Sequence, residues 1–176
     1  MTATLKPFTT LTDYVTGRPV PNIGAEENRQ AVQRVLVESK GFAKTDIEAG
    51  VPIAFPIRGA VYRSRLDLVV RVDGEPVMVV TCVAGAIGSW ERQTLAGARL
   101  IEPLPAPCAV VSDGRTASVL DASSGRRLGD SLEAIPSKSD ARRILESAGR
   151  QPFPAERRER ESLIFRTYDL ERVNRV

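Results

Sequence analysis

Histidine is absent from the 176-residue sequence, and this absence excludes several common catalytic systems. Serine and cysteine nucleophiles activated by histidine, histidine-ligated zinc and acid–base catalysis by imidazole all need a residue that the chain lacks. Lysine is scarce as well, and the few residues of this type are Lys6, Lys40, Lys44 and Lys138. Any catalysis would therefore depend on carboxylates, arginine, tyrosine, one of these lysines or a metal ion held by oxygen ligands.

Cysteine and long apolar segments are also in short supply. The two cysteines, Cys82 and Cys108, lie in apolar segments, which favours buried thiols in a reducing compartment over a disulfide scaffold. No apolar run approaches the roughly 20 residues that would span a bilayer. Residues 1–10 contain one lysine and lack the apolar stretch of a secretory signal. We therefore expect a cytoplasmic protein without a membrane partner.

The net charge of +3 and the pI of about 9.1 raise the question of a nucleic-acid partner. Residues 137–176 contain ten basic and seven acidic side chains, so this segment accounts for the whole net charge and residues 1–136 are balanced. Mixed signs along a helical segment are typical of a solvated face. The basic composition alone therefore does not predict a DNA groove.

The length and the 42% hydrophobic content predict one domain with a substantial core. Residues 1–21 are polar and punctuated by proline, which predicts an extended N-terminal arm. Residues 22–136 hold the alternating and apolar segments of the core. Residues 137–176 are expected to form C-terminal helices that pack on this core or flank it.

Three strands are predicted after a first helix over residues 25–39. Residues 47–57 alternate between apolar and other residues, and two prolines in this segment predict an edge strand. Residues 61–72 and 76–83 are joined by Asp73-Gly74, which is typical of a two-residue hairpin turn. The last of these strands is almost continuously apolar and is expected at the centre of the sheet.

A helix over residues 90–101 follows, and then two strands and two further helices. The element order is therefore α-βββ-α-ββ-αα. An antiparallel meander followed by a helical crossover predicts an α/β fold with a mixed five-stranded sheet and helices on both faces.

Five short strings occur in a characteristic order between about residue 22 and residue 148. They are Glu26-Glu27-Asn28-Arg29-Gln30, Lys40-Gly41-Phe42, Arg63-Ser64-Arg65-Leu66-Asp67-Leu68-Val69-Val70, Glu91-Arg92-Gln93 and Val111-Ser112-Asp113-Gly114. Together they resemble the N-terminal domain of the R subunit of type I restriction enzymes. That family is a branch of the PD-(D/E)xK nucleases and has the restriction-endonuclease-like fold. The resemblance implies DNA as a partner.

The resemblance also implies a set of site residues. The family places an aspartate on the second strand of the meander and an acid-x-lysine on the third, where residues i and i+2 share one face. The carboxylates hold Mg²⁺ against the phosphate, and the lysine positions the attacking water. Asp67 matches the aspartate, and Glu26 and Gln93 match two further site residues. Asp67 and the backbone carbonyl of Cys82 would be the metal ligands.

The third strand departs from this pattern, because Thr81-Cys82-Val83 stands where the acid and the lysine are expected. A threonine hydroxyl is a poor magnesium ligand, and valine cannot handle a proton. Losing positioned proton transfer alone removes roughly 10²–10⁴ in rate. The sequence therefore predicts a degenerate site with little or no cleavage and no resident cofactor. The domain would then bind nucleic acid or dock a protein partner.

Two other functions stay open at this point. An active Mg²⁺-dependent endonuclease is possible if an acid or a lysine has moved to a neighbouring element, with Glu26, Glu27, Glu48 and Glu91 as candidate acids. A structural or oligomerisation domain would instead use the arginine-rich C-terminal helices, either with a partner or with a second copy.

The individual side chains have structural alternatives too. Arg63 and Arg65 can contact a phosphate backbone, or they can pair with Asp67 and with acids of the first helix. The structural alternative for Asp67 is that it simply forms an ion pair with Arg65 and has no role in a site. Gln93 can be an ordinary polar residue of its helix.

Overall fold

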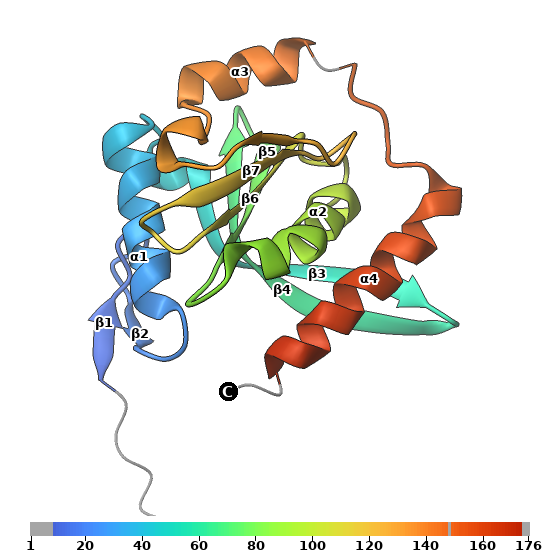
Figure 1. Cartoon of the computed structure of the whole chain (residues 1–176), viewed down its shortest axis with the longest axis horizontal. Coiled ribbons are helices and arrows are strands. Elements are labelled where there is room, and N and C mark those ends of the chain that lie inside the picture. Colours follow the sequence, from blue (N-terminus) through green and yellow to red (C-terminus); the bar gives the residue numbers. More distant parts are fainter. Residues whose placement is uncertain (1–8, 148, 174–176) are drawn as a thin grey trace, which may run out of the picture.

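The computed structural model describes residues 9–147 and 149–173 (Figure 1). The helices are α1 (Glu26–Arg34), α2 (Glu91–Leu100), α3 (Lys138–Ser147) and α4 (Ala155–Val173). A small antiparallel sheet consists of β1 (Thr10–Thr12) and β2 (Pro19–Pro21). The main sheet contains β3 (Ile47–Ile57), β4 (Ala60–Val72), β5 (Glu75–Cys82), β6 (Cys108–Ser112), β7 (Ala117–Asp121) and β8 (Arg127–Gly129). These strands lie in chain order, and only β5 and β6 pair in parallel.

The α/β class and the mixed sheet are confirmed, whereas the predicted number of five strands is wrong. The sixth strand of the main sheet is β8, which pairs with β7 across a register irregularity at Val119/Leu120. Its three residues are too few and too polar to show a period of two, so the sequence carried no signal for it. In the region of the predicted arm, β1 and β2 form a hairpin, and residues 1–8 lie outside the described part.

Helices cover both faces of the main sheet, as predicted. On one face, Leu36 at the end of the first helix and Ala141 of α3 pack against Leu68 of β4 and Val80 of β5. On the other face, α2 and Phe165 of α4 pack against the alternate strand residues, such as Val69, Val79 and Ala109. Adjacent strand residues therefore belong to opposite layers, as the period of two requires. In the described part of the chain, no helix has the length and apolar character needed to cross a membrane.

The strand assignments in the centre of the chain follow the predictions closely. β5 lies between β4 and β6 and is buried along almost its whole length. Asp73 and Gly74 have φ angles of 52° and 82°, which are the two positive values of a type I′ turn. β3 forms the edge of the sheet. Its regular pairing with β4 continues through Pro52 and Pro56, so the missing amide groups of these prolines lie on the outer side.

The β3–β4 hairpin changes its buried face halfway along, at a position that we call the crease. Ala49 and Leu68 are paired and pack on the layer of α1, whereas Val51 and Leu66 are paired and pack on the layer of α2 and α4. Between these two pairs lie Gly50, with a φ of 63°, and Asp67. The outer half of the hairpin therefore turns toward α4, beneath which it extends in Figure 1.

Helix α4 docks on α2 and on the outer half of the hairpin (Figure 1). Phe165 meets the Phe55 ring edge-on at a centroid distance of 5.6 Å. Gly97 of α2 permits this close approach, because a Cβ atom there would lie 3.0 Å from Leu66 and 3.3 Å from Phe165. Glu161, which is 3% exposed, receives two hydrogen bonds from Arg92 and one from Arg99 of α2. This charged network and the aromatic contact fasten α4 to the core.

Candidate functional site

Asp67 lies at the crease, where β4 parts from β5. Regular pairing between the two strands ends at Leu68 and Val80, so the amide of Cys82 lies beyond the ladder. The Asp67 carboxylate accepts a hydrogen bond of 2.8 Å from this amide. Asp67 therefore has a structural task, since it satisfies a backbone donor at the end of a buried strand.

A small cavity of about 120 Å³ joins Asp67 to the first helix. Asp67, Glu26, Arg29 and Cys82 line it together with two apolar residues. Three of the residues that the resemblance assigned to the site therefore meet here, although they come from α1, β4 and β5. Arg29, which the resemblance did not assign, lies among them.

The carboxylate of Glu26 is already engaged by neighbours on its own helix. Arg29 donates to both of its oxygens at 3.1 and 2.7 Å, and Gln30 donates to one of them at 2.6 Å. The Arg29 guanidinium also lies 3.0 Å from Asp13 of the N-terminal hairpin. Burial lowers the pKa of Arg29, but these carboxylates outweigh that effect and raise it. A permanent positive charge therefore stands beside Glu26.

Asp13 is a buried residue of the N-terminal hairpin that contacts side chains of α1. It is 1% exposed and accepts hydrogen bonds from Gln30 and Gln33, both at 3.2 Å, and from the backbone of Thr16 at 2.8 Å. Burial raises the pKa of Asp13, but the hydrogen bonds from Thr16, Gln30 and Gln33 prevail and lower it to about 2. The hairpin is thus held to α1 by a buried charge network.

The third strand has no ionisable side chain at the positions of the expected acid and lysine. Thr81 is buried, and its hydroxyl accepts a 2.7 Å hydrogen bond from Thr94 of α2. Val83 is also buried, and its carbonyl accepts a hydrogen bond from Asn28 of α1 at 2.7 Å. Both positions therefore contribute to packing between the sheet and the helices.

Gln93 is buried between α2 and α4 and does not line the small cavity. Its amide nitrogen lies 3.5 Å from Asp169 of α4, which is a long hydrogen bond, and its Oε1 atom has no partner among the described residues. Asp169 accepts a much shorter hydrogen bond of 2.6 Å from the Tyr62 hydroxyl. Burial, this hydrogen bond and the Asp169 charge together raise the pKa of Tyr62 to about 12.

A larger hollow of about 670 Å³ lies on the other side of Asp67, along the outer half of the hairpin. Arg63, Arg65, Asp67, Tyr62 and Asp169 are among its lining residues. Both arginines are exposed, and Arg65 donates to the Gly50 carbonyl at 2.7 Å. Because Asp67 lines both cavities, the small cavity and the hollow meet at the crease.

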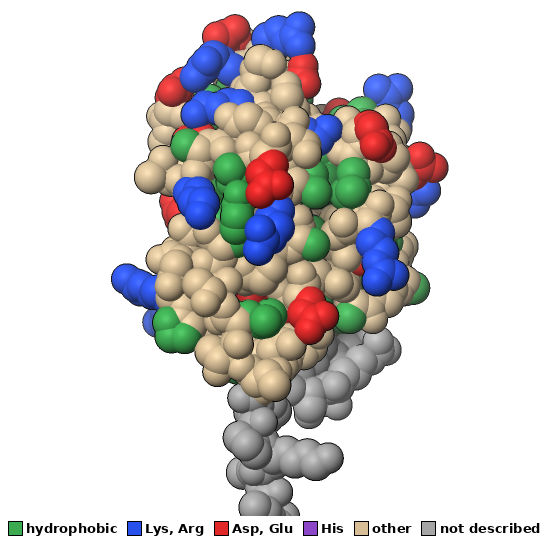
Figure 2. Space-filling model, turned by 90° about the vertical axis from the view of Figure 1, so that its left-hand side faces the viewer, with side chains coloured by type: hydrophobic (Ala, Val, Ile, Leu, Met, Phe, Trp, Pro, Cys, Tyr) green, Lys and Arg blue, Asp and Glu red, His purple; other side chains and the backbone are tan. Residues whose placement is uncertain are grey.

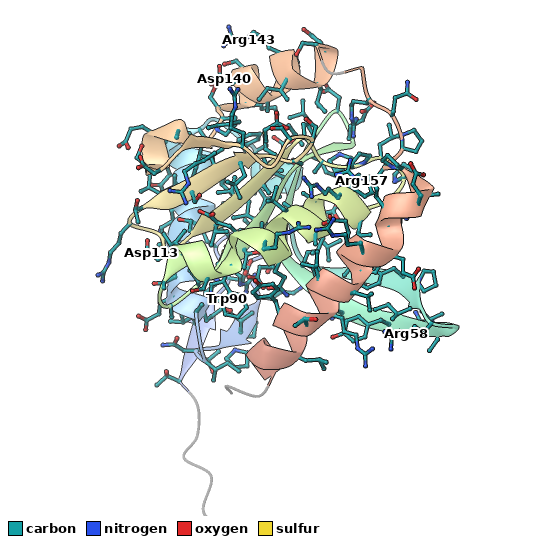
Figure 3. The ribbon with its side chains drawn as sticks, turned by 45° about the vertical axis from the view of Figure 1, so that its right-hand side comes forward. Arg58, Trp90, Asp113, Asp140, Arg143 and Arg157 are labelled. Carbon is teal, nitrogen blue, oxygen red and sulfur yellow. The ribbon has the colours of Figure 1, made fainter. Side chains whose placement is uncertain are left out.

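Two further arginines lie outside the lining of this hollow, on the same hairpin and on α4. Arg58 lies at the tip of the hairpin (Figure 3), and Arg166 of α4 lies over the Tyr62 ring, 5.8 Å from its centroid. Both are exposed. Together with Arg63 and Arg65 they form a group that we call the arginine rim.

Sequence reasoning missed Arg29 and Asp169. The spacing of three residues between Glu26 and Arg29 could have revealed the first, because such pairs meet on a helix surface. No local pattern could have revealed Asp169, since its position depends on how α4 docks.

The side chains of the site do not form a recognisable metal centre. Among the described residues, no group of three or more histidine, cysteine, aspartate or glutamate side chains could hold a metal ion. Glu26 is engaged by Arg29 and Gln30, and Thr81 is turned toward α2. At the small cavity, Mg²⁺ would therefore have Asp67 and the already engaged Glu26 as its carboxylates and would need water or phosphate oxygens to complete its shell.

Residues 24–136 match the family model described as type I restriction enzyme R protein N terminus (HSDR_N). The match begins just before α1 and ends before α3, so it covers the main sheet, α1 and α2. No curated protein and no solved structure matches the chain.

Proposed function

Because the chain belongs to the type I restriction enzyme R protein N-terminal family, we propose that it is a DNA-binding domain whose phosphodiester-cleaving site has degenerated. The observation that carries this proposal is the pair of buried side chains at the positions of the acid and the lysine, which are Thr81 of β5 and Val83 directly after this strand. A hydroxyl bonded to α2 and an isopropyl group provide neither a metal ligand nor a proton donor at the reacting phosphate.

The positions of the other ionisable groups support the loss of cleavage. Lys40 donates to the Glu133 carbonyl, Lys138 pairs with Asp46, and Lys44 lies over the Tyr14 ring. None of these three lysines lines the cavities at Asp67. The fourth, Lys6, lies outside the described residues. In the described part, the basic side chain that lines the small cavity is Arg29, beside Glu26. A guanidinium group cannot replace the lysine as a base, because it stays protonated.

The arginine rim supports binding to DNA. Its four arginines are exposed on the hairpin and on α4, two of them line the hollow, and guanidinium groups bind phosphate oxygens without reading the base sequence. The face that carries α1 has a different character, because Figure 2 shows basic and acidic side chains interspersed there. A phosphate backbone would therefore approach the hairpin and α4 rather than α1.

One observation favours the second candidate, an active Mg²⁺-dependent endonuclease with a relocated acid. Asp67 and Asp169 both line the hollow, so two carboxylates from different elements face one space. The hydrogen bond from Tyr62 to Asp169 weighs against this candidate, and so does the absence of lysine from the described residues that line the hollow. It makes a distinct prediction, which is loss of activity in Asp67→Ala and Asp169→Asn.

Cleavage is tested with supercoiled plasmid DNA and Mg²⁺ or Mn²⁺. We expect wild type to produce no more nicked or linear DNA than Asp67→Ala. The double variant Thr81→Glu/Val83→Lys restores the expected acid and lysine. Nicking of the plasmid by this variant would show that these two side chains can still reach the space beside Asp67. Cleavage by wild type that disappears in Asp67→Ala would overturn the degenerate site.

Binding is tested by fluorescence anisotropy with a labelled DNA duplex over a range of salt concentrations. Arg63→Ala/Arg65→Ala should weaken binding at least tenfold at low salt and lower the salt dependence by about two counterions, since each phosphate contact contributes a slope of about 0.9. The matched control is Arg142→Ala/Arg143→Ala on α3, which removes the same charge elsewhere. No binding by wild type at low salt, or equal losses in both variants, would refute the DNA-binding role of the rim.

A further inference from the structure

A cavity of about 290 Å³ lies where the segment between α3 and α4 passes the end of α2. Arg99 of α2, Arg150 of the connecting segment and Arg157 of α4 line it, and no acidic residue is among its described lining residues. Figure 3 shows Arg157 near the beginning of α4. The cavity shares no lining residue with the two cavities at Asp67, so it is a separate site. We call it the linker cavity.

Positive charge is in excess at one end of the linker cavity. Glu161 pairs with both Arg99 and Arg92, so one carboxylate serves two guanidinium groups. Arg157 has no carboxylate partner in the described part of the chain. Arg92 does not line the linker cavity, so the excess there consists of the charge of Arg157 and the part of the Arg99 charge that the shared Glu161 does not balance. Burial lowers the pKa of Arg99, and the charge of Glu161 raises it, while the like charges of Arg92 and Arg157 lower it further.

Arg150 provides an independent sign that a polar partner is missing. Its side chain is only 9% exposed. It forms an ion pair with Glu75, and one of its terminal nitrogens lies 3.3 Å from the carbonyl oxygens of Pro76 and Pro105. Its Nε atom is buried and has no hydrogen-bond partner among residues 9–147 and 149–173. A buried donor without an acceptor is unfavourable. A ligand that accepted a hydrogen bond from the Nε atom of Arg150, after a small shift of this side chain, would remove that cost and stabilise the fold.

The remaining walls suit a molecule with an apolar or planar part. Pro105, Pro107, Pro152 and Phe153 supply most of the apolar surface. The guanidinium groups of Arg99 and Arg157 lie 5.8 and 5.3 Å from the Phe153 ring centroid, and these contacts help to orient them. The cavity also adjoins the first turn of α4, whose positive helix-dipole end favours an anion, although the Arg157 amide already donates to the Pro154 carbonyl at 3.0 Å.

We propose that the linker cavity binds a phosphate monoester attached to a planar organic group. A phosphate group is complementary to the unpaired guanidinium of Arg157 and to that of Arg99, which shares its carboxylate with Arg92, and arginine beside a helix N-terminus is a common phosphate-binding combination. The volume is at the lower end of the roughly 300–1,000 Å³ of small-molecule sites. Two sources share this chemistry, a free nucleoside monophosphate and the phosphorylated 5′ end of a DNA strand.

The test uses the full chain and three probes, which are AMP and a short oligonucleotide with either a 5′ phosphate or a 5′ hydroxyl. Binding is measured by calorimetry or anisotropy in the Arg63→Ala/Arg65→Ala background, so that loss of DNA binding at the arginine rim cannot be mistaken for loss at this site. Arg157→Ala removes one lining charge from an exposed residue, and Arg157→Lys retains the charge. Arg160→Ala is the matched control, because Arg160 lies on the same helix and does not line the linker cavity.

We expect Arg157→Ala to weaken binding of AMP at least tenfold, Arg157→Lys to weaken it less and Arg160→Ala to leave it unchanged. A tenfold preference for the 5′-phosphorylated oligonucleotide that disappears in Arg157→Ala would support the proposal with a DNA end as the source. The proposal is overturned if neither AMP nor the 5′ phosphate is bound at millimolar concentration. Equal losses in Arg157→Ala and Arg160→Ala would overturn it as well, since they would indicate a general charge effect.

Discussion

The substitution Glu161→Gln tests how strongly α4 is fastened to the core. Glu161 is 3% exposed and accepts hydrogen bonds from Arg92 at 2.8 and 3.0 Å and from Arg99 at 3.1 Å. The variant keeps the size of the side chain and one acceptor oxygen but leaves two adjacent guanidinium groups without their counter-charge. Removing one partner of a buried ion pair typically costs about 3–5 kcal/mol, and we expect about 3 kcal/mol here because Arg92 is partly exposed.

The assay is equilibrium unfolding in urea, followed by circular dichroism and by tryptophan fluorescence. With a denaturant dependence of about 2 kcal/mol per molar urea, the expected loss lowers the midpoint by about 1.5 M. Glu159→Gln is the matched control, since it makes the same change two residues away at an exposed position. We expect the control to stay within about 0.5 kcal/mol of wild type.

The pH dependence provides a second readout of the same contact. Burial raises the pKa of Glu161, but Arg92 and Arg99 outweigh it and lower the pKa below the ordinary value of 4.5. A lowered pKa stabilises the fold above pH 4.5, and this stabilisation is lost as the pH falls through the lowered value. The difference between wild type and Glu161→Gln should therefore shrink in acid. A variant as stable as wild type at pH 7 would refute the assignment of this network as the fastening of α4.

Three further predictions concern other parts of the molecule. Asp13→Asn should lower the free energy of unfolding by about 2 kcal/mol at neutral pH and by progressively less from about pH 4 to pH 2, because the pKa of Asp13 lies near 2 in the folded protein. Urea unfolding at several pH values measures this difference, and a difference that did not change with pH would contradict the prediction. Gly97→Leu should destabilise the protein by about 1–3 kcal/mol, since a side chain there meets Leu66 and Phe165, whereas Gly85→Ala faces open space and should have little effect on the melting temperature. Burial and the charge of Asp121 raise the pKa of Cys108 to about 12, so this thiol should react with Ellman's reagent at pH 8 only when the protein unfolds. Rapid reaction of Cys108 in the native protein would contradict this prediction, because it would show that β6 is accessible to the reagent.

The sequence predicts well those features of the fold that depend on residues close together in the chain, such as turns and the burial of single strands. The Asp73-Gly74 turn, the central position of β5 and the edge position of β3 follow from local turn chemistry, apolar continuity and proline. The first helix was also expected, although its end is a π-helical turn over Val35–Ser39 in which the Lys40 amide donates to the Val35 carbonyl. Such a change of hydrogen-bond spacing leaves no trace in the apolar pattern.

The composition of the candidate site was harder to predict, because it depends on contacts between distant segments. Asp67, Glu26 and Cys82 line one small cavity, but the family resemblance rather than any spacing rule suggested their meeting. The resemblance gave no indication that Arg29 would engage Glu26 or that Asp13 would come from the N-terminal hairpin. Asp169 reaches the hollow because α4 docks on the core, where Glu161 and Phe165 make contacts between distant segments.

The prolines of β3 have a consequence for how copies of this protein can assemble. An edge strand with free amides on its outer side can recruit a strand from another molecule and so extend the sheet. Pro52 and Pro56 remove two amide donors from that side, so a second chain would find an interrupted row of donors. Concentrated solutions of the folded protein should therefore resist extension of the sheet through β3, and pairing through the sheet would have to use the short strand β8 at the other edge.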